Sequence, residues 1–252
     1  MGKVVVIRND SVVQQFETPD TAFDCAWGPQ GGLVAAMGNG QLAVCCENPS
    51  AFKREHTREL TSIDWNSTGI LSSSYDGLVK LWTINTPRSL SSIKISDDCV
   101  QEVRWSKRFA DSFLAACSDK SASVWDISAS RTNSVLKLEG HIHEVMSCDW
   151  SQDGQQVVTA SADGSIRVWD LRNPKTSTAL LAHRGVVRRV RYSQDNKLIA
   201  SVGYDMTLRI WQEGKCCFVE DSMTEFGSGL DFAPNGSPFY CGWDGKVRTL
   251  QT

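Results

Sequence analysis

The sequence predicts an all-β propeller, a ring of small four-stranded sheets called blades. The first observation is a repeated segment in which a turn residue is followed, six positions later, by the end of an apolar strand. Five copies span residues 76–82, 119–125, 163–169, 205–211 and 244–250, and a degraded copy spans residues 39–45. The copies end 37, 43, 44, 42 and 39 residues apart. A period of about 40 residues with a terminal tryptophan is typical of propeller blades.

The second observation is an aromatic residue that ends the inner strand of every repeat: Trp27, Trp65, Trp105, Trp150, Tyr192 and Phe232. A small apolar strand, a tight Asp-Gly turn and a third strand follow. In the third strand of the fourth repeat, alternation places Ile166 and Val168 on one face and Arg167 and Trp169 on the other. A weaker outer strand, such as 134–138, completes the unit. One blade cannot bury both faces alone, so the blades must stack around a ring.

The sequence repeats predict the fold but leave two possible numbers of blades. Residues 3–8 and 12–16 read as a strand pair that precedes the six repeats. We expect a single domain over residues 1–252, a seven-bladed ring whose N-terminal blade is incomplete. Six blades with an extra N-terminal strand are the alternative, and a start site downstream of the native one would also explain the short first blade. A missing inner strand exposes a sheet edge, which promotes association.

Composition excludes several functional classes. The 252 residues carry a net charge of −3, which does not favour a nucleic-acid partner. The nine cysteines are scattered without a CxxC pair, as in reduced cytosolic or nuclear proteins. No apolar run reaches membrane-spanning length, and the start lacks a signal peptide. We therefore expect no membrane insertion, no cofactor and no metal site.

Six strings carry a closer resemblance: EHTRELTSIDW at 55–65, HEVMSCDW at 143–150, WDLRNP at 169–174, HRGVVRRVRYS at 183–193, MTEFGSGLDF at 223–232 and CGWDGKV at 241–247. Through them the chain resembles WD-repeat propellers, and among these the peroxin-7 family of peroxisomal import receptors. The resemblance implies a cargo receptor that shuttles between the cytoplasm and the peroxisome. It implies as partners the N-terminal (type 2) targeting peptide of matrix proteins, a co-receptor and the peroxisomal docking machinery. The chain departs from the pattern at Cys45, where a tryptophan is expected, and at Asp97-Asp98, where a histidine is expected.

Three histidines occupy one repeat position, and the resemblance implies that each bonds a turn aspartate beside a serine and the terminal tryptophan. The expected structural sets are His56/Ser74/Asp76/Trp82, His141/Ser161/Asp163/Trp169 and His183/Asp205/Trp211, the last with Gly203 in place of the serine. The sets resemble Ser-His-Asp triads, but they recur at the blade period, whereas an enzyme needs one such site. We interpret them as buried networks that lock the turns and expect no catalytic residues.

The implied ligand is a short helix with a basic and an aliphatic residue at its start and a His or Gln with an apolar residue about two turns later. Residues just before or at the start of each inner strand, and those before each turn aspartate, share one rim of the ring. The expected cargo-binding set is Phe23, Glu59, Tyr75, Glu144, Met146, Arg188, Tyr204, Glu225 and Trp243. Its aromatics and methionine suit an apolar helix face. Its glutamates suit the basic residue.

Other functions remain as alternatives. The string Trp169-Asp170-Leu171-Arg172 matches the WDxR motif of substrate adaptors for cullin-type ubiquitin ligases. It occurs once in six repeats, which makes it a weak signal. A general WD-repeat scaffold is the third hypothesis, and an enzyme is the last.

Overall fold

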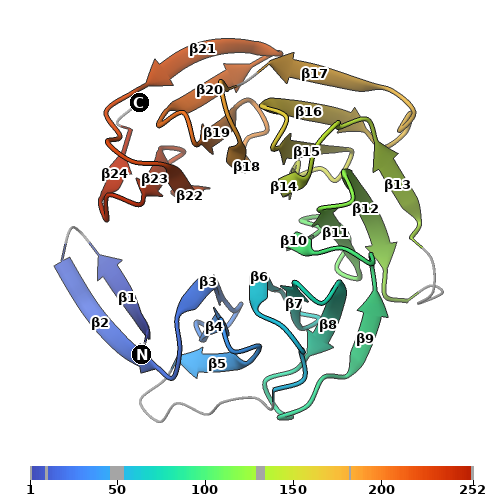
Figure 1. The fold of residues 1–252 in the computed structure, drawn as a ribbon, viewed down its shortest axis with the longest axis vertical. Helices are drawn as coiled ribbons and strands as arrows, with labels where there is room; N and C mark the ends of the chain where they lie inside the picture. Colours follow the sequence, from blue (N-terminus) through green and yellow to red (C-terminus); the bar gives the residue numbers. More distant parts are fainter. Residues whose placement is uncertain (1, 9–10, 46–53, 129–133, 182, 251–252) are drawn as a thin grey trace.

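The computed structural model describes residues 2–8, 11–45, 54–128, 134–181 and 183–250, and within them every regular element is a β-strand. Figure 1 shows antiparallel sheets arranged as blades around a central axis, with an opening between the last blade and the N-terminal hairpin. Each blade is a meander whose strands follow one another in sequence. The all-β propeller predicted from the repeats is confirmed.

Within each blade the strands follow one another from the channel to the outer edge of the ring. The hairpin is β1 (Gly2–Arg8) and β2 (Ser11–Thr18). The first blade is β3 (Ala22–Trp27), β4 (Leu33–Met37) and β5 (Leu42–Cys45). The second is β6 (Leu60–Trp65), β7 (Ile70–Ser74), β8 (Leu78–Trp82) and β9 (Ser91–Lys94). The third is β10 (Val100–Trp105), β11 (Ser112–Cys117), β12 (Ser121–Asp126) and β13 (Leu136–Glu139).

The second half repeats this order. The fourth blade is β14 (Val145–Trp150), β15 (Gln156–Ser161), β16 (Ser165–Asp170) and β17 (Ser177–Leu181). The fifth is β18 (Val187–Tyr192), β19 (Ile199–Gly203), β20 (Leu208–Gln212) and β21 (Lys215–Glu220). The sixth is β22 (Gly227–Phe232), β23 (Pro238–Gly242) and β24 (Val247–Thr249).

The structure has six blades, the alternative count, rather than the seven that we favoured. The hairpin β1–β2 forms a two-stranded sheet of its own and has no inner strand at the channel. It does bury Val4 and Phe16 against Leu33, Ala35 and Met37 of the first blade. The hairpin therefore covers the face of a blade without being a full blade.

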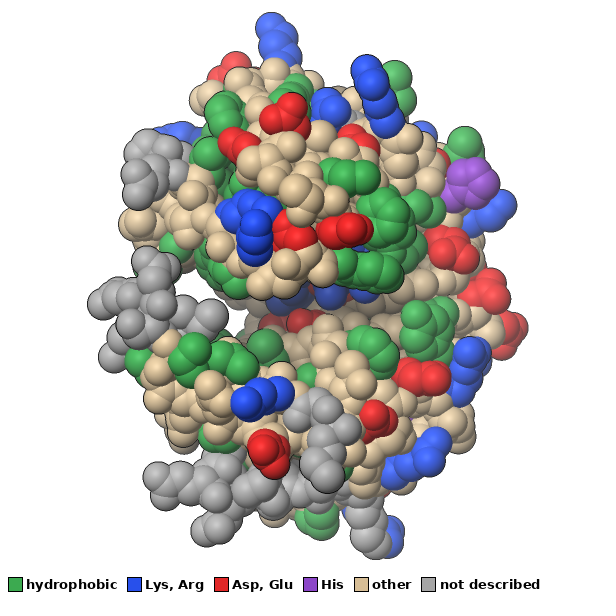
Figure 2. All heavy atoms as spheres, turned by 60° about the vertical axis from the view of Figure 1, so that its left-hand side comes forward, with side chains coloured by type: hydrophobic (Ala, Val, Ile, Leu, Met, Phe, Trp, Pro, Cys, Tyr) green, Lys and Arg blue, Asp and Glu red, His purple; other side chains and the backbone are tan. Residues whose placement is uncertain are grey.

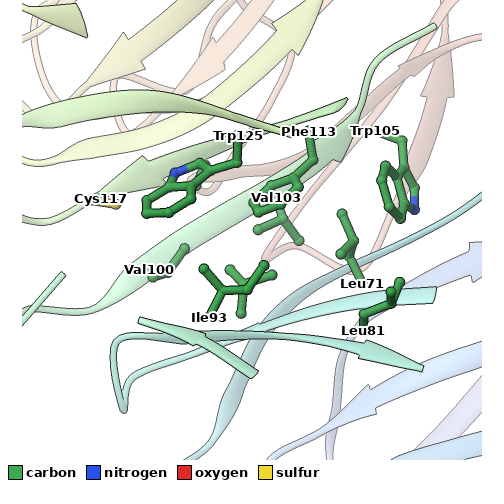
Figure 3. Close-up of a cluster of buried hydrophobic side chains, with 11 residues drawn as sticks. Leu71, Leu81, Ile93, Val100, Val103, Trp105, Phe113, Cys117 and Trp125 are labelled. Carbon is green, nitrogen blue, oxygen red and sulfur yellow. The ribbon is translucent and has the colours of Figure 1, made fainter. Parts of the chain in front are cut away.

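Blade faces pack through alternate side chains. In β16, Ile166 and Val168 pack toward the fifth blade, whereas Trp169 packs toward the third. Figure 3 shows the equivalent layer between the second and third blades, where Phe113 stacks on Trp125 with ring centroids 6.2 Å apart. Burying one such large side chain contributes about 1.5–3 kcal/mol. Because both faces of the blade are covered, the predicted alternation fills two core layers.

Every inner strand carries a register shift beside its second residue. The shift is a β-bulge, which leaves one residue unpaired and re-aims its side chain. The residues skipped by the pairing are Phe23, Thr61, Gln101, Met146, Arg188 and Ser228. Three of the expected cargo-binding residues are therefore bulge residues at the same end of the ring.

Candidate functional site

One end of the propeller is built from the loops that lead into the inner strands and from the turns between second and third strands. Backbone hydrogen bonds join the two sets in the second, fourth, fifth and sixth blades. The N–H groups of Tyr75, Ala162, Tyr204 and Trp243 donate to the carbonyls of Glu59, Glu144, Val186 and Phe226, at 2.9–3.1 Å. These bonds hold the two sets of residues together, and we call the surface that they form the rim.

A pocket of about 490 Å³ lies on the rim and gathers five of the nine expected cargo-binding residues: Tyr75, Glu144, Met146, Arg188 and Tyr204. They come from the second, fourth and fifth blades, which lie apart in the sequence. The remaining lining residues are Arg58, Asp97, Asp98, Cys99, Gln101 and Ser118. The acids Asp97 and Asp98 come from the loop that leads into β10, the position at which the neighbouring blades carry a histidine.

Aromatic rings extend the pocket toward the sixth blade. Tyr204 stacks on Phe226 with centroids 4.8 Å apart and an interplanar angle of 23°. Phe226 meets Trp243 edge-on at 5.9 Å, and Trp243 is 67% exposed. We call these three residues the aromatic ladder. Tyr204 and Phe226 are half-buried, so Trp243 is the exposed member of the ladder. Aromatic rings at a surface are common anchors for apolar partner side chains.

The other expected residues lie outside the pocket. Glu59 and Glu225 are exposed in the loops that lead into β6 and β22. Phe23 is exposed on the first blade, where its ring lies 3.1 Å from the position that a Cβ on Gly38 would occupy. The structure thus groups the set into a pocket, a ladder and three isolated residues.

Charges in the pocket are mixed. The guanidinium of Arg58 lies 5.3 Å from the centre of the Tyr75 ring and donates to the Tyr75 carbonyl at 3.2 Å. Asp97 is fully solvated beside Lys94, at 3.6 Å. Burial raises the pKa of the Cys99 thiol to about 12, so this sulfur is a neutral thiol at neutral pH and a poor nucleophile. The pocket therefore offers carboxylates, guanidinium groups and aromatic faces rather than a reactive group.

The basic residues of VRRVRY lie mainly inside the channel. Glu102 of β10, which is fully buried, accepts bonds from Arg189 at 2.9 Å and Arg191 at 2.7 Å on β18. Burial alone would raise the pKa of Glu102, but the guanidinium groups of Arg191, Arg189 and Arg104 hold it well below its usual range. Burial lowers the pKa of Arg189 to about 10, which leaves it charged at neutral pH.

The blade networks differ from the expected sets in their hydroxyl group. His56 Nδ1 lies 2.9 Å from Asp76, and its Nε2 lies 2.9 Å from Ser72 Oγ, which also accepts from the Trp82 indole at 2.8 Å. Ser74, the serine that we expected, instead accepts from the Asp76 N–H at 3.1 Å. Trp82 stands opposite Ile70, so its indole reaches the hydroxyl two residues further along the same face.

The same correction applies to the other two sets. Thr159, not Ser161, joins His141 at 2.8 Å and Trp169 at 2.9 Å. Ser201 joins His183 at 2.8 Å and Trp211 at 3.0 Å, so the third set has its hydroxyl after all.

Gly203 does not stand in for the missing serine. A Cβ at Gly203 would lie 2.7 Å from the Val186 carbonyl, so this position has no room for a side chain. The aspartates of the two sets are as expected, at 2.9 Å from His141 for Asp163 and 2.7 Å from His183 for Asp205.

Among the described residues, no group of three or more His, Cys, Asp or Glu side chains is placed to hold a metal ion. The described part of the chain also contains no helix that could cross a membrane. The WDxR string lies at the end of the ring opposite the rim. There the side chain of Arg172 is 70% exposed and its Nε donates to Asp170 at 2.9 Å.

The fold and the repeats define the class of protein. The WD domain, G-beta repeat family matches residues 47–83, 132–170 and 174–212. Together with the six stacked blades, these matches make the chain a WD-repeat β-propeller. The fold and the relatives described next point to a non-catalytic protein.

Among WD-repeat proteins, the chain is similar to peroxisomal targeting signal 2 receptors over nearly its full length. It is 27% identical to the receptor of Saccharomyces cerevisiae, over 98% of this chain and 88% of that protein. It is 25% identical to the receptor of Schizosaccharomyces pombe, over 95% of this chain and 83% of that protein. The nuclear distribution protein PAC1 of Arthroderma otae is 26% identical, but only 54% of its length is covered. The resemblance noted from the six strings is thus confirmed.

Proposed function

We propose that the chain is a receptor for the type 2 targeting signal of peroxisomal matrix proteins and that it binds this peptide on the rim. The observation that carries the proposal is the continuous surface from the pocket to the aromatic ladder, in a chain similar to two receptors named for this signal. The rest of the pathway, a co-receptor and the docking machinery that take cargo from the cytoplasm to the peroxisome, belongs to the same proposal.

The chemistry of the surface suits a basic, amphipathic helix. Glu144, Asp97 and Asp98 offer carboxylates to the basic residue, and charge-assisted hydrogen bonds to such groups are stronger than neutral ones. Tyr204, Phe226 and Trp243 offer ring faces to the apolar residues. A helix that lays its apolar face in a groove is a common mode of peptide recognition.

A peptide titration tests the proposal. A fluorescent peptide with the basic-aliphatic start and the later His-apolar pair is titrated with the purified chain, with and without cytosolic extract. We expect saturable binding that Glu144→Lys weakens at least tenfold, a change of about 1.4 kcal/mol. A peptide with glutamate in place of its basic residue should regain affinity for the Glu144→Lys variant. Binding only with extract would indicate that a co-receptor completes the site.

The matched control is Glu213→Lys, an exposed glutamate in the turn between β20 and β21, at the opposite end of the ring. If both variants weaken peptide binding equally, the change in net charge explains the loss, and a contact at Glu144 is not needed. If Glu144→Lys binds like the unaltered chain, the rim assignment is wrong. If no peptide binds a folded sample in either condition, the receptor proposal fails and the scaffold alternative gains.

The exposed side chain of Arg172 keeps the ubiquitin-ligase adaptor as a second candidate. That function predicts association with the ligase linker protein, which Arg172→Ala abolishes while peptide binding survives. A pull-down with the linker protein separates the two candidates.

A further inference from the structure

The ring is open between the sixth blade and the first blade with its hairpin. Figure 1 places β22–β24 on one side of this opening and β1, β2 and β3 on the other. Figure 2 turns this side forward and shows a hollow between the two halves, with hydrophobic side chains on both walls and charged ones at its floor. The exposed apolar residues on the flanking elements are Val5, Val12, Val13, Phe23, Trp27, Phe239, Trp243 and Val247.

Two of the five closed joints between the six blades, those that follow the second and the fourth blade, share a hydrogen bond that bears on the opening. Asp64 of the second blade accepts the N–H of its own neighbour Trp65 on Oδ1, at 3.0 Å. Its other oxygen, Oδ2, accepts the N–H of Trp105 on the inner strand of the third blade, at 2.7 Å. Asp149 likewise accepts the N–H of Tyr192 in the fifth blade at 2.8 Å. At these two joints an inner-strand aspartate joins one blade to the backbone of the next. The other three joints have Ala26, Arg104 and Arg191 at this position.

Asp231 of the sixth blade makes half of this joint. It occupies the same strand position, next to the terminal aromatic Phe232, and its Oδ1 accepts the Phe232 N–H at 2.8 Å. The residue is exposed, and Oδ2 receives no hydrogen bond from the part of the chain that the structure describes. Its carboxylate is therefore held ready for an N–H group on a strand lying beside β22.

The opposite wall offers the complementary half. In closed joints the terminal aromatic packs on the preceding blade: the Trp105 indole donates to the Gly69 carbonyl at 3.0 Å and the Trp150 indole to Arg104 at 3.1 Å. Those two rings are 4% and 1% exposed. Trp27 holds this position in the first blade, yet it is 54% exposed, and no described residue accepts from its indole. By its equivalence to Trp105 and Trp150, this is the ring that would pack on a preceding blade.

The hairpin contributes a third unsatisfied feature beside the opening, an unpaired strand edge. Among the described strands, β1 pairs with β2 alone, so its other edge has no ladder partner. An unpaired edge presents backbone N–H and C=O groups that bind an added strand. In Figure 1 this edge of β1 faces the interior of the ring.

We propose that the opening binds a two-stranded antiparallel segment of another polypeptide, which completes the ring. Its inner strand lies between β22 and β3, donates an N–H to Asp231 and ends in an acidic residue followed by an aromatic one. The turn after this strand accepts the indole N–H of Trp27. Its second strand pairs with the free edge of β1. This partner chemistry follows from the joints that the chain makes with itself.

A labelled peptide with the sequence of residues 143–161 of this chain is a suitable probe, because it contains an inner strand with Asp149-Trp150 and a second strand. Titration with the full chain should give saturable one-to-one binding. Asp231→Ala should weaken that binding at least fivefold, whereas the control Asp221→Ala, exposed outside the inner strands, should leave it unchanged. Hydrogen exchange of the complex should show new protection of β1 amides.

Each outcome decides the proposal. Absence of saturable binding, or binding that Asp231→Ala and Asp221→Ala affect equally, overturns it, as does binding that leaves β1 unprotected. Light scattering of the chain alone tests whether a second copy of the chain occupies the opening instead. A concentration-dependent dimer that Asp231→Ala dissociates would show that a second copy closes the opening, and the strand-pair proposal would then be wrong. Signal-peptide binding on the rim is measured separately, so the two proposals fail independently.

Discussion

The carboxylate of Glu102 on β10 lies 2.7 Å from the guanidinium of Arg191 on β18, although one whole blade separates these strands. The same carboxylate accepts from Ser147 and from the Cys148 N–H on β14, the inner strand of the blade between them. One buried side chain therefore joins three consecutive blades at the channel.

Glu102→Ala should destabilise the propeller strongly. The substitution leaves Arg189 and Arg191 buried without their counter-ion, which typically costs about 3–5 kcal/mol. Urea denaturation followed by tryptophan fluorescence measures the loss. The control is Glu139→Ala, which removes an exposed ion pair with Lys137 and should cost under about 1 kcal/mol. Similar losses in the two variants would contradict the proposed role of Glu102.

Thr159→Val should perturb the fourth-blade network where Ser161→Ala does not. The valine keeps the shape of threonine but removes the hydroxyl that serves both His141 and Trp169, at a cost of about 1–3 kcal/mol. The indole N–H resonance of Trp169 reports on this bond directly. It should shift in Thr159→Val and stay in place in Ser161→Ala, and the reverse pattern would restore the assignment that we first expected.

Acid should destabilise the chain in two ranges of pH. Burial lowers the pKa of His141 below 6.5, so the unfolded chain takes up this proton first and stability falls as the pH drops below about 6.5. Burial would raise the pKa of Asp163, but hydrogen bonds from Ser165 and His141 hold it at about 2, against an ordinary 3.8. The stability that the Asp163 carboxylate contributes is fully present above about pH 4, and it is lost as the pH falls toward 2.

Denaturation at a series of pH values measures both ranges. In Asp163→Asn the free energy of unfolding should depend less on pH between about 4 and 2, because the substitution removes the group whose pKa differs between the folded and unfolded chains. An unchanged slope in this variant would mean that the other carboxylates account for the loss.

Phe226→Ala should weaken signal-peptide binding about tenfold, which corresponds to about 1.4 kcal/mol. The ring stacks on Tyr204 and supports Trp243, so its loss removes one anchor and loosens two others. Phe109→Ala is the control, since it also removes a phenylalanine ring but follows β10 at the opposite end of the ring; Phe109 is exposed, whereas Phe226 is half-buried. Fluorescence anisotropy compares the two variants, and equal affinities would exclude the aromatic ladder from the site.

Arg172→Ala should leave both the stability and the peptide affinity within error of the unaltered chain. The side chain is exposed and its ion pair with Asp170 lies at the surface, where solvent screens such pairs and they contribute little to stability. A thermal melt and the peptide titration check this outcome. Weaker peptide binding in this variant would show that the site reaches the other face of the ring.

The sequence located part of the site and misjudged another part. Met146 and Arg188 were expected at the rim as residues of the loops that lead into inner strands; they are instead the second residues of β14 and β18, where β-bulges place them at the same end of the ring. Asp97 and Asp98 were noted only as a departure from the repeat pattern and were left out of the expected site, because spacing along the chain does not show that their loop borders the same pocket as Glu144. The hydroxyl position of each blade network was placed two residues too late, at Ser74, Ser161 and Gly203 instead of Ser72, Thr159 and Ser201. Spacing along the chain does not show how far an indole reaches along the neighbouring strand.

The sequence by itself determined the all-β fold, the blade period and the end of the ring that carries the rim, because strand alternation and turn residues act over short distances. Only the tertiary structure decided the rest. Glu102 and Arg191 meet across 89 positions of sequence, the pocket gathers residues from four blades, and Asp231 and Trp27 face an opening instead of a neighbour. These relationships depend on how whole blades stack around the axis, and no local pattern encodes that stacking.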